Sequence, residues 1–320
     1  MTSKESAPTT HPVPASAPGN AEIPSGEPSL PSPSFSQWDT SQRSYLVDAW
    51  HRLRSHFLAM GGLTLLAILL AGMIFAPLIA PYDPDKISYD ILTGPSREHL
   101  LGTDDLGRDI LSRLIYASRI SLSVGLSVAF VTSIIGTAIG CLAGYYGGRV
   151  DALLSAFVNV MLSIPLLPLA MVLAAFMRTN LYFIILILGC LYWTWTARLI
   201  RAEVLALKAR EFVTAARIVG ASDWRIISRH VLPNAFPPLI VAATLNVAAA
   251  ILAESALSYL GYGIQPPTAS WGNMLQNAQR YLRSAPVLAV YPGLLISITV
   301  ISINFLGDGL RDALDPRLRT

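Results

Sequence analysis

The segment Glu211–Asn234, which reads EFVTAARIVGASDWRIISRHVLPN, decides how the rest of the chain is interpreted. It is charged and amphipathic, and it lies between long uncharged apolar runs. Gly220 can adopt a positive φ and so suits the end of a first helix, while Ser222 or Asp223 can cap a second. Pro233 should end that second helix, because proline removes a backbone donor. The segment therefore predicts two short helices joined near Gly220.

The apolar side chains of this segment are spaced for one face on each side of the glycine. Ala215, Ala216 and Val219 form the first face, and Ile226 and Ile227 form the second. Periodicity alone leaves two interpretations open. The segment is either an ordinary amphipathic linker at a membrane surface or a loop that docks into a groove of a partner protein.

The composition indicates a protein that crosses a membrane several times. Of the 320 residues, 53% are hydrophobic and only 13% are charged, whereas soluble domains carry about 25% charged residues. Six apolar runs, each with at most one charged residue, are long enough for the roughly 20 residues that a spanning helix needs. These predicted spans are 57–80, 120–144, 152–177, 179–198, 236–258 and 286–307. Buried helices of a soluble protein are the weaker alternative, because they rarely exceed about 14 residues without a charge.

The apolar runs divide the chain into three regions. Residues 1–40 are rich in Pro and Ser, so we expect a disordered cytoplasmic tail. Residues 41–56 mix Arg with aromatic side chains and suit an interfacial segment on the cytoplasmic side. Residues 57–320 form the transmembrane domain, with a loop at 199–235. A cytoplasmic N-terminus places fifteen of the 23 Lys and Arg residues inside, which favours both termini there.

The loop resembles the "EAA" loop of the inner-membrane subunits of binding-protein-dependent ABC importers. That pattern has E-A-A, three residues, Gly, nine residues and then I-x-L-P. Five positions are in register: Ala215, Ala216, Gly220, Leu232 and Pro233. Thr214 stands where the pattern has Glu, and His230 where it has Ile. The missing Glu removes support for an ion pair at that position but leaves the glycine turn intact.

Three further strings resemble the dipeptide, oligopeptide and nickel branch of these permeases, and within it the C-type subunits of dipeptide importers. They are LGTDDLGRDILSRLIY from Leu101, GIQPPTASWG from Gly263 and NFLGDGLRDALDPRLR from Asn304. The resemblance covers roughly Leu101–Arg319. It implies the all-α type I ABC importer permease fold with six transmembrane helices. It also implies a cytoplasmic (inner) membrane location, a second permease subunit, two cytoplasmic ATPases and an extracytoplasmic substrate-binding protein.

The resemblance assigns the coupling to the ATPases to one set of residues in the loop. We expect this role for Glu211, Thr214, Ala215, Ala216, Gly220, Ala221, Asp223, Trp224, Arg229, Leu232 and Pro233. The sequence has no phosphate-binding loop of the form G-x-x-x-x-G-K-[ST]. We therefore expect no cofactor and no catalysis in this chain, with ATP and Mg²⁺ bound by partner subunits. We expect a lipid membrane around the chain and no nucleic acid partner.

Three residues within the apolar runs are candidates for a pathway or gate. Glu254 is a functional candidate because an unpaired carboxylate in an apolar zone costs several kcal/mol. The alternative is a carboxylate solvated at the outer interface, which the nearby Tyr259, Tyr262 and Trp271 favour. Pro165 frees a backbone carbonyl, so it is either a hinge or part of ordinary packing. Asn246 is the third candidate.

Two other patterns leave alternatives open. Asp104, Asp105 and Asp109 suggest a cation site, but the preferred interpretation is an amphipathic helix on the outer surface, capped by Thr103 or Asp104. The small-residue stripe Gly136-x-x-x-Gly140-x-x-x-Gly144 predicts close helix packing, either within the chain or between subunits.

The preferred function is a permease for short peptides, with nickel or another small solute as the alternative. An ion-driven secondary transporter is the rival from another class, and it would want several buried carboxylates or an inverted repeat. An intramembrane enzyme would need a catalytic set within the spans, and none of the five histidines lies in mid-span.

Overall fold

The structure is a computed structural model that describes residues 45–177 and 180–314. The predicted tail 1–40 and the first residues of the interfacial segment 41–56 lie outside the described residues. Helices and turns make up the described part. They are α1 Tyr45–Ser55, α2 Phe57–Ile74, α3 Ala76–Ile79, α4 Ile110–Tyr146, α5 Gly148–Ser163, α6 Leu166–Phe176, α7 Leu181–Lys208, α8 Glu211–Ile218, α9 Asp223–Ile226, the π-helical turn η2 Ile227–Val231, α10 Leu232–Tyr259, α11 Trp271–Ala278, the 3₁₀ turn η3 Gln279–Tyr281 and α12 Val287–Leu314.

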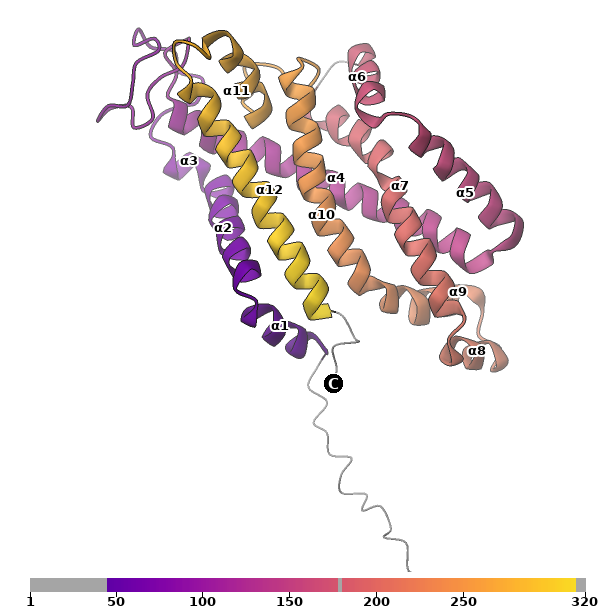
Figure 1. The fold of residues 1–320 in the computed structure, drawn as a ribbon. Helices are drawn as coiled ribbons and strands as arrows, with labels where there is room; N and C mark the ends of the chain where they lie inside the picture. The colour runs from indigo at the N-terminus through magenta and orange to yellow at the C-terminus, as the bar shows by residue number, and fades with distance from the viewer. Residues whose placement is uncertain (1–44, 178–179, 315–320) are drawn as a thin grey trace, which may run out of the picture. The chain divides into compact units, whose positions relative to one another are not determined.

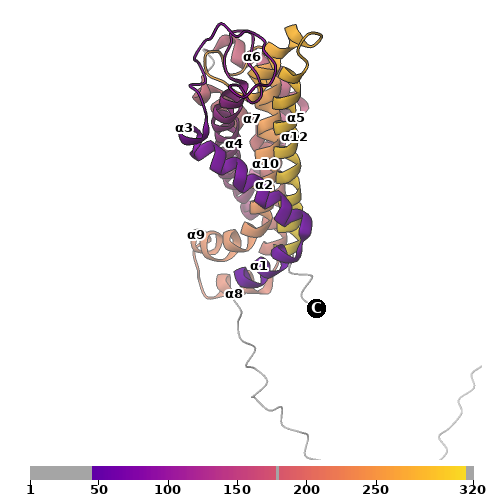
Figure 2. The same cartoon turned by 90° about the vertical axis from the view of Figure 1, so that its left-hand side faces the viewer.

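Five of the described helices are long and apolar enough to cross a membrane, and the bent pair α5–α6 makes six if it counts as one span. The long helices pack side by side, α4 with α7, α10 with α4 and α12, and α12 with α2 (Figure 1). Helices α8 and α9 lie at one end of this bundle, hereafter the loop end, and α11 lies at the opposite far end (Figure 1). The view in Figure 2 also places α6 at the end opposite α8. The all-α membrane fold is confirmed.

The glycine stripe of α4 packs within the chain, which decides between the two alternatives. A Cβ on Gly136 would lie 2.5 Å from the Cβ of Thr196, and a Cβ on Gly140 would lie 2.6 Å from the carbonyl oxygen of Ala197. A Cβ on Gly144 would meet Arg201 and Val204 at 2.9 Å. All four neighbours lie on α7. Small residues at helical spacing therefore let the α4 and α7 backbones approach closely. Of the two alternatives from the sequence, the structure shows packing within the chain.

The predicted span 152–177 is two helices rather than one kinked helix. Helices α5 and α6 meet at an angle of 82°. Pro165 has an extended backbone and occupies the N-cap position of α6, so the chain leaves helical geometry at this residue. Pro168 lies in the first turn of α6, where its missing donor has no intrahelical partner to lose. Pro165 thus marks a break in the chain and Pro168 does not.

The predicted surface helix between residues 101 and 119 is wrong. Residues 103–109 form a turn that is largely buried, and α4 begins at Ile110 and continues without a break to Tyr146. Asp109 caps α4, since its Oδ2 accepts hydrogen bonds from the backbone N–H of Ser112 at 2.8 Å and from its hydroxyl at 2.7 Å. Neither Thr103 nor Asp104 is the cap. The residues expected to form a separate helix on the outer surface instead form the first turns of α4, which enters the bundle.

Two of the three carboxylates in this turn, Asp104 and Asp105, are paired with arginines, and Asp109 lies 3.0 Å from His99 Nδ1, which answers the cation-site alternative. Arg108 Nε donates to Asp104 Oδ2 at 2.7 Å, and Arg113 Nε lies 3.5 Å from the same oxygen. Among residues 45–177 and 180–314, no cluster of His, Cys, Asp and Glu side chains is arranged to hold a metal ion. The turn is an internal salt-bridge network that fixes the start of α4.

Candidate functional site

The two loop helices are joined at Gly220, as the sequence predicted. Gly220 has φ +82° and follows Val219, the C-cap of α8. The Gly220 N–H donates to the carbonyl of Arg217, and the Ala221 N–H donates to the carbonyl of Ala216, both at 3.0 Å. These two bonds define a Schellman motif, which satisfies the last carbonyls of α8. The turn therefore has a single defined geometry.

The inner side of the loop is anchored to the bundle by apolar packing. Val213, Ile226 and Val231 are fully buried, together with Ile200 and Val204 of α7. Cys141 and Tyr145 at the end of α4 complete this cluster. Burying a large aliphatic side chain contributes about 1.5–3 kcal/mol. The loop is consequently fixed to α4 and α7 and moves with them.

The outer side of the loop exposes large apolar side chains, which we call the α8–α9 face. Ile218, Val219 and Trp224 are 81%, 87% and 77% exposed. Arg217 and Arg225 lie exposed beside them. The predicted second apolar face, Ile226 and Ile227, is buried, whereas the predicted first face is partly wrong, because Ala215 and Val219 are exposed. An exposed apolar patch rimmed by charges is typical of a docking site for a protein.

A polar contact joins α9 to the end of α4. The Tyr145 hydroxyl donates to Asp223 Oδ1 at 2.6 Å. The backbone carbonyl of Tyr145 also accepts a hydrogen bond from Lys208 Nζ at 2.5 Å, at the end of α7. Tyr145 therefore connects α4 with both the end of α7 and the loop helix α9. Sequence reasoning missed this residue, because nothing in its spacing distinguishes it from other interfacial tyrosines.

The second loop helix does not end at Pro233, which corrects the sequence prediction. The chain passes from α9 through the π-helical turn η2 directly into α10, and Pro233 lies in the first turn of α10. The missing donor of a proline is tolerated there. The loop and α10 are thus continuous helical structure from Asp223 onward.

The other predicted loop residues divide between the two sides. Ala216, Ala221 and Leu232 are half-buried against the anchoring cluster. The exposed residues of the predicted set are Glu211, Thr214, Ala215, Gly220, Asp223, Trp224, Arg229 and Pro233. At its start, the predicted loop 199–235 differs from the structure, because α7 continues as a helix to Lys208.

Glu254 is fully buried at the far end, so the alternative of a carboxylate solvated at the interface is wrong. Its carboxylate accepts hydrogen bonds from the hydroxyls of Ser258 at 2.7 Å, Ser121 at 3.3 Å and Ser255 at 3.5 Å. Within residues 45–177 and 180–314 it has no cationic partner within ion-pair distance. Hydroxyl donors replace the water that this carboxylate has lost.

The serines around Glu254 extend the network into the segment that follows α10. The Ser121 hydroxyl accepts from the backbone N–H of Trp271 at 3.2 Å, and the Ser258 hydroxyl accepts from the N–H of Ile264 at 3.1 Å. Trp271 is itself fully buried and donates its Nε1–H to the carbonyl of Leu114. Glu254 therefore holds α4, α10 and the start of α11 together. The sequence singled out Glu254 but not its serine partners.

Asn246, a predicted pathway or gate residue, makes contacts that join three helices. Its Nδ2 donates to the hydroxyl of Thr196 on α7 at 2.9 Å and lies 3.4 Å from the hydroxyl of Thr132 on α4. Asn246 is only half-buried, so its amide also has an accessible part. The contact places a polar layer between α4, α7 and α10.

The comparisons with known proteins agree with this arrangement of helices and loop. Residues 136–320 match the family model described as "Binding-protein-dependent transport system inner membrane component". This match covers more than half of the chain and includes α8, α9 and α10. The chain belongs to this family of inner membrane components. Residues 44–95 of the permease also match a model for the N-terminal transmembrane domain of oligopeptide transport permease C.

Several curated relatives are similar to this permease over most of their length. The di/tripeptide transport system permease protein DppC of Pseudomonas aeruginosa is 40% identical over 86% of this chain and 93% of its own. The dipeptide transport system permease protein DppC of Escherichia coli is 46% identical over 86% of this chain and 94% of its own. The corresponding protein of Bacillus subtilis is 41% identical, covering 86% and 87%.

A solved structure supports the fold of the permease. A chain of the MetNI methionine ABC transporter in an inward-facing conformation aligns with a TM-score of 0.53 and 21% identity. The alignment covers 64% of this chain and 98% of the other. The type I importer permease fold is thereby confirmed. Family membership implies two kinds of partner, an ATPase and a substrate-binding protein, and a place within a membrane.

Proposed function

We propose that this chain is the transmembrane permease subunit of an ATP-driven importer of short peptides. It forms one half of the translocation pathway, and a second, different permease subunit forms the other half. Two ATPase subunits bind ATP and Mg²⁺ and supply the work. The chain itself then needs no cofactor and catalyses no reaction. The family match and the dipeptide names of relatives at 40% and 46% identity support this proposal.

The α8–α9 face is the observation that carries the coupling role. Ile218, Val219 and Trp224 project from a turn of defined geometry, and the inner side of the same loop is anchored to α4 and α7. A partner that grips such a face moves the bundle rather than only bending a loose segment. We therefore assign this face to the groove of an ATPase, in a helix-in-groove contact.

The proposed orientation puts the loop end in the cytoplasm, with both termini on the same side of an inner membrane. The excess of Lys and Arg in the loop-end segments supports this direction, because positively charged segments are retained in the cytoplasm. A substrate-binding protein then meets the far end, which carries α11 and the 81–109 segment.

Among the possible solutes, short peptides are favoured over nickel. The relatives compared above carry dipeptide or di/tripeptide transport in their names. No observation within the described residues favours a metal ion, since no metal-binding cluster occurs there. Family membership also disfavours the ion-driven carrier.

Substituting Gly220 tests the coupling role. At φ +82° a β-branched side chain is strained by about 1–2 kcal/mol, whereas Asn tolerates this conformation. Nothing lies within 4 Å of an added Cβ, so the strain is confined to the backbone of the turn. We expect Gly220→Val to lower dipeptide uptake by about 5- to 30-fold and Gly220→Asn to retain it. Uptake and peptide-stimulated ATP hydrolysis are measured on the complete complex in proteoliposomes.

The amount of complex in the membrane is the control for this comparison. Equal incorporation of both variants with loss of uptake only in Gly220→Val supports coupling through the turn. Full uptake and normal stimulation of ATP hydrolysis in Gly220→Val would sink the coupling role of the α8–α9 turn.

A further inference from the structure

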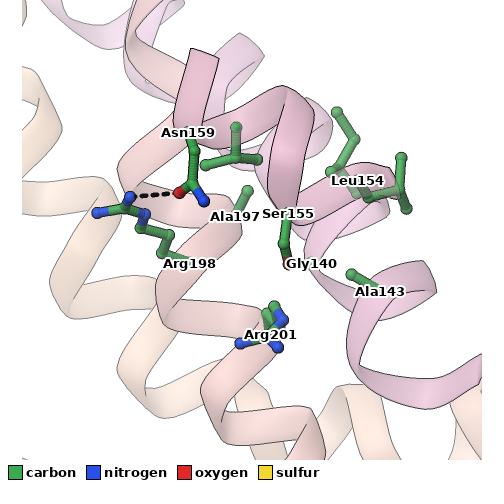
Figure 3. A pocket seen from close by; sticks show the side chains of 10 residues that line it. Gly140, Ala143, Leu154, Ser155, Asn159, Ala197, Arg198 and Arg201 are labelled. Atoms are coloured by element: carbon green, nitrogen blue, oxygen red, sulfur yellow. Dashed lines mark hydrogen bonds between the residues drawn. The ribbon is translucent and has the colours of Figure 1, made fainter. Parts of the chain in front are cut away.

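A cavity of about 410 Å³ lies between α4, α5 and α7. Its apolar wall includes Gly140, Ala143, Leu154 and Ala197. Figure 3 shows Arg198, Asn159, Ser155 and Arg201 around the same space. Its volume falls within the roughly 300–1,000 Å³ range of small-molecule sites.

The two arginines of the cavity differ in their partners. Arg201 is neutralised, because its Nε and NH2 donate to the carboxylate oxygens of Asp151 at 2.5 and 2.7 Å. Arg198 instead donates from NH2 to the amide oxygen of Asn159 at 2.7 Å (Figure 3). Asn159 carries no charge, and Arg198 takes part in no ion pair within residues 45–177 and 180–314. The cavity therefore holds one uncompensated positive charge.

The position of the cavity suits the phosphate layer of a membrane. Ala143 lies in the last turn of α4, and Arg198 lies ten residues before the end of α7 at Lys208. At 1.5 Å per residue, Arg198 is about 15 Å along the helix from that end. Arg198 is also the last residue of the predicted span 179–198, so its long side chain can reach the headgroups. Basic pockets between transmembrane helices at this level bind phosphate headgroups.

The surface beside the cavity is apolar. On α5, Leu153, Phe157 and Val160 are exposed and follow one another at helical spacing, next to the lining residues Leu154 and Val158. A small inorganic anion gains nothing from this surface, whereas an acyl chain gains van der Waals contact along it. The planar guanidinium of Arg198 matches the oxygens of a phosphate group.

We infer that this cavity binds the phosphate group of an anionic phospholipid, with Arg198 on the phosphate and the acyl chains along α5. Free phosphate shares the headgroup chemistry, and the apolar flank favours the lipid. The inference does not depend on the transported solute or on the ATPases.

A pair of variants at Asn159 tests the charge argument without removing the arginine. Asn159→Asp places a carboxylate where the amide oxygen lies 2.7 Å from Arg198, so it neutralises the guanidinium in place. Asn159→Ala leaves the guanidinium free. Asn159 is exposed, so both variants should fold. In native mass spectrometry of the complete complex with equal phosphatidylglycerol and phosphatidylcholine, we expect Asn159→Asp to retain about fivefold less phosphatidylglycerol. Asn159→Ala should retain it as the wild type does.

Two controls complete the experiment. Arg210→Gln removes an exposed arginine outside the cavity and should leave retention unchanged, while Arg198→Gln should lower it as Asn159→Asp does. In a separate arm, inorganic phosphate is added to lipid-free complex in detergent and the melting temperature is measured. Wild-type retention of phosphatidylglycerol in both Asn159→Asp and Arg198→Gln overturns the site. An Arg198-dependent stabilisation by inorganic phosphate alone overturns its assignment to a lipid.

Discussion

At the scale of single residues, Glu254 determines how the far end is held. A carboxylate without a cation inside a helix bundle is costly unless donors surround it. Here three hydroxyls serve as the donors, and two of them also bind backbone groups beyond α10. Within the described part of the chain, Glu254, a predicted pathway or gate residue, links α4, α10 and the start of α11 through these hydrogen bonds.

Substituting Glu254 should therefore weaken the fold more than a surface carboxylate does. Glu254→Ala leaves three buried hydroxyls without an acceptor, which we expect to lower the free energy of unfolding by about 1–3 kcal/mol. Glu254→Gln retains one carbonyl oxygen and the shape, so its loss should be smaller. Both are measured by denaturation of the purified permease in detergent. The control Glu98→Ala removes an exposed carboxylate and should change stability by less than about 0.5 kcal/mol. Equal stability of Glu254→Ala and wild type would contradict the role of the network.

The glycine stripe makes a prediction at the scale of the helices. A methyl group on Gly136 would lie 2.5 Å from the Cβ of Thr196 and 2.9 Å from the carbonyl oxygen of Trp193. Gly136→Ala must then push α4 and α7 apart, at a cost of about 1–3 kcal/mol. Gly61 in α2 is the matched control, because nothing lies within 4 Å of an added Cβ. Gly61→Ala should leave stability unchanged or raise it by up to about 1 kcal/mol.

Thermal unfolding of the two glycine variants in the same detergent measures this difference. We expect Gly136→Ala to have the lowest melting temperature, and Gly61→Ala to melt at or above the temperature of the wild type. If Gly136→Ala and Gly61→Ala have the same melting temperature, the stability of the permease does not depend on the close approach of α4 and α7.

The prolines show why helix boundaries were only partly predictable. Pro165 breaks the chain between α5 and α6, whereas Pro237 and Pro238 lie inside α10 and Pro292 lies inside α12. All four prolines lack a backbone N–H donor, so the sequence alone predicts the same helix-breaking effect for each. The difference comes from packing, because α10 and α12 are held along their lengths by neighbouring helices that outweigh a lost hydrogen bond.

The Gly220 turn was predictable for the opposite reason. Its conformation depends on one local property, the freedom of glycine at positive φ, and this property is visible in the sequence. The serine network of Glu254 joins Ser121 to residues more than a hundred positions later in the chain. No local sequence pattern predicts such a contact.

At the scale of the whole molecule, Tyr145 connects the loop with the bundle. Tyr145→Phe removes only the hydroxyl that donates to Asp223 at 2.6 Å. We expect a loss of about 0.5–1.5 kcal/mol in stability and fewer peptides imported per ATP hydrolysed, because α9 then moves more freely relative to α4. Both rates are measured on the complete complex in proteoliposomes.

The neighbouring Tyr146 provides the matched control for this prediction. Its side chain is exposed, and Tyr146→Phe should change neither rate. An unchanged ratio of peptides to ATP in Tyr145→Phe would show that the hydroxyl contact does not carry the movement.

The continuity of α10 with the loop has a mechanical consequence. Leu232–Tyr259 is an uninterrupted helix of 28 residues, which corresponds to about 42 Å at 1.5 Å per residue. It begins where the π-helical turn leaves α9 and ends beside Glu254. Such a helix acts as a lever arm: a tilt of about 10° at the loop end displaces the other end by about 7 Å. That stroke exceeds the spacing between two adjacent residues of an extended peptide, so a small rotation at the loop corresponds to a step of substrate size at the opposite end.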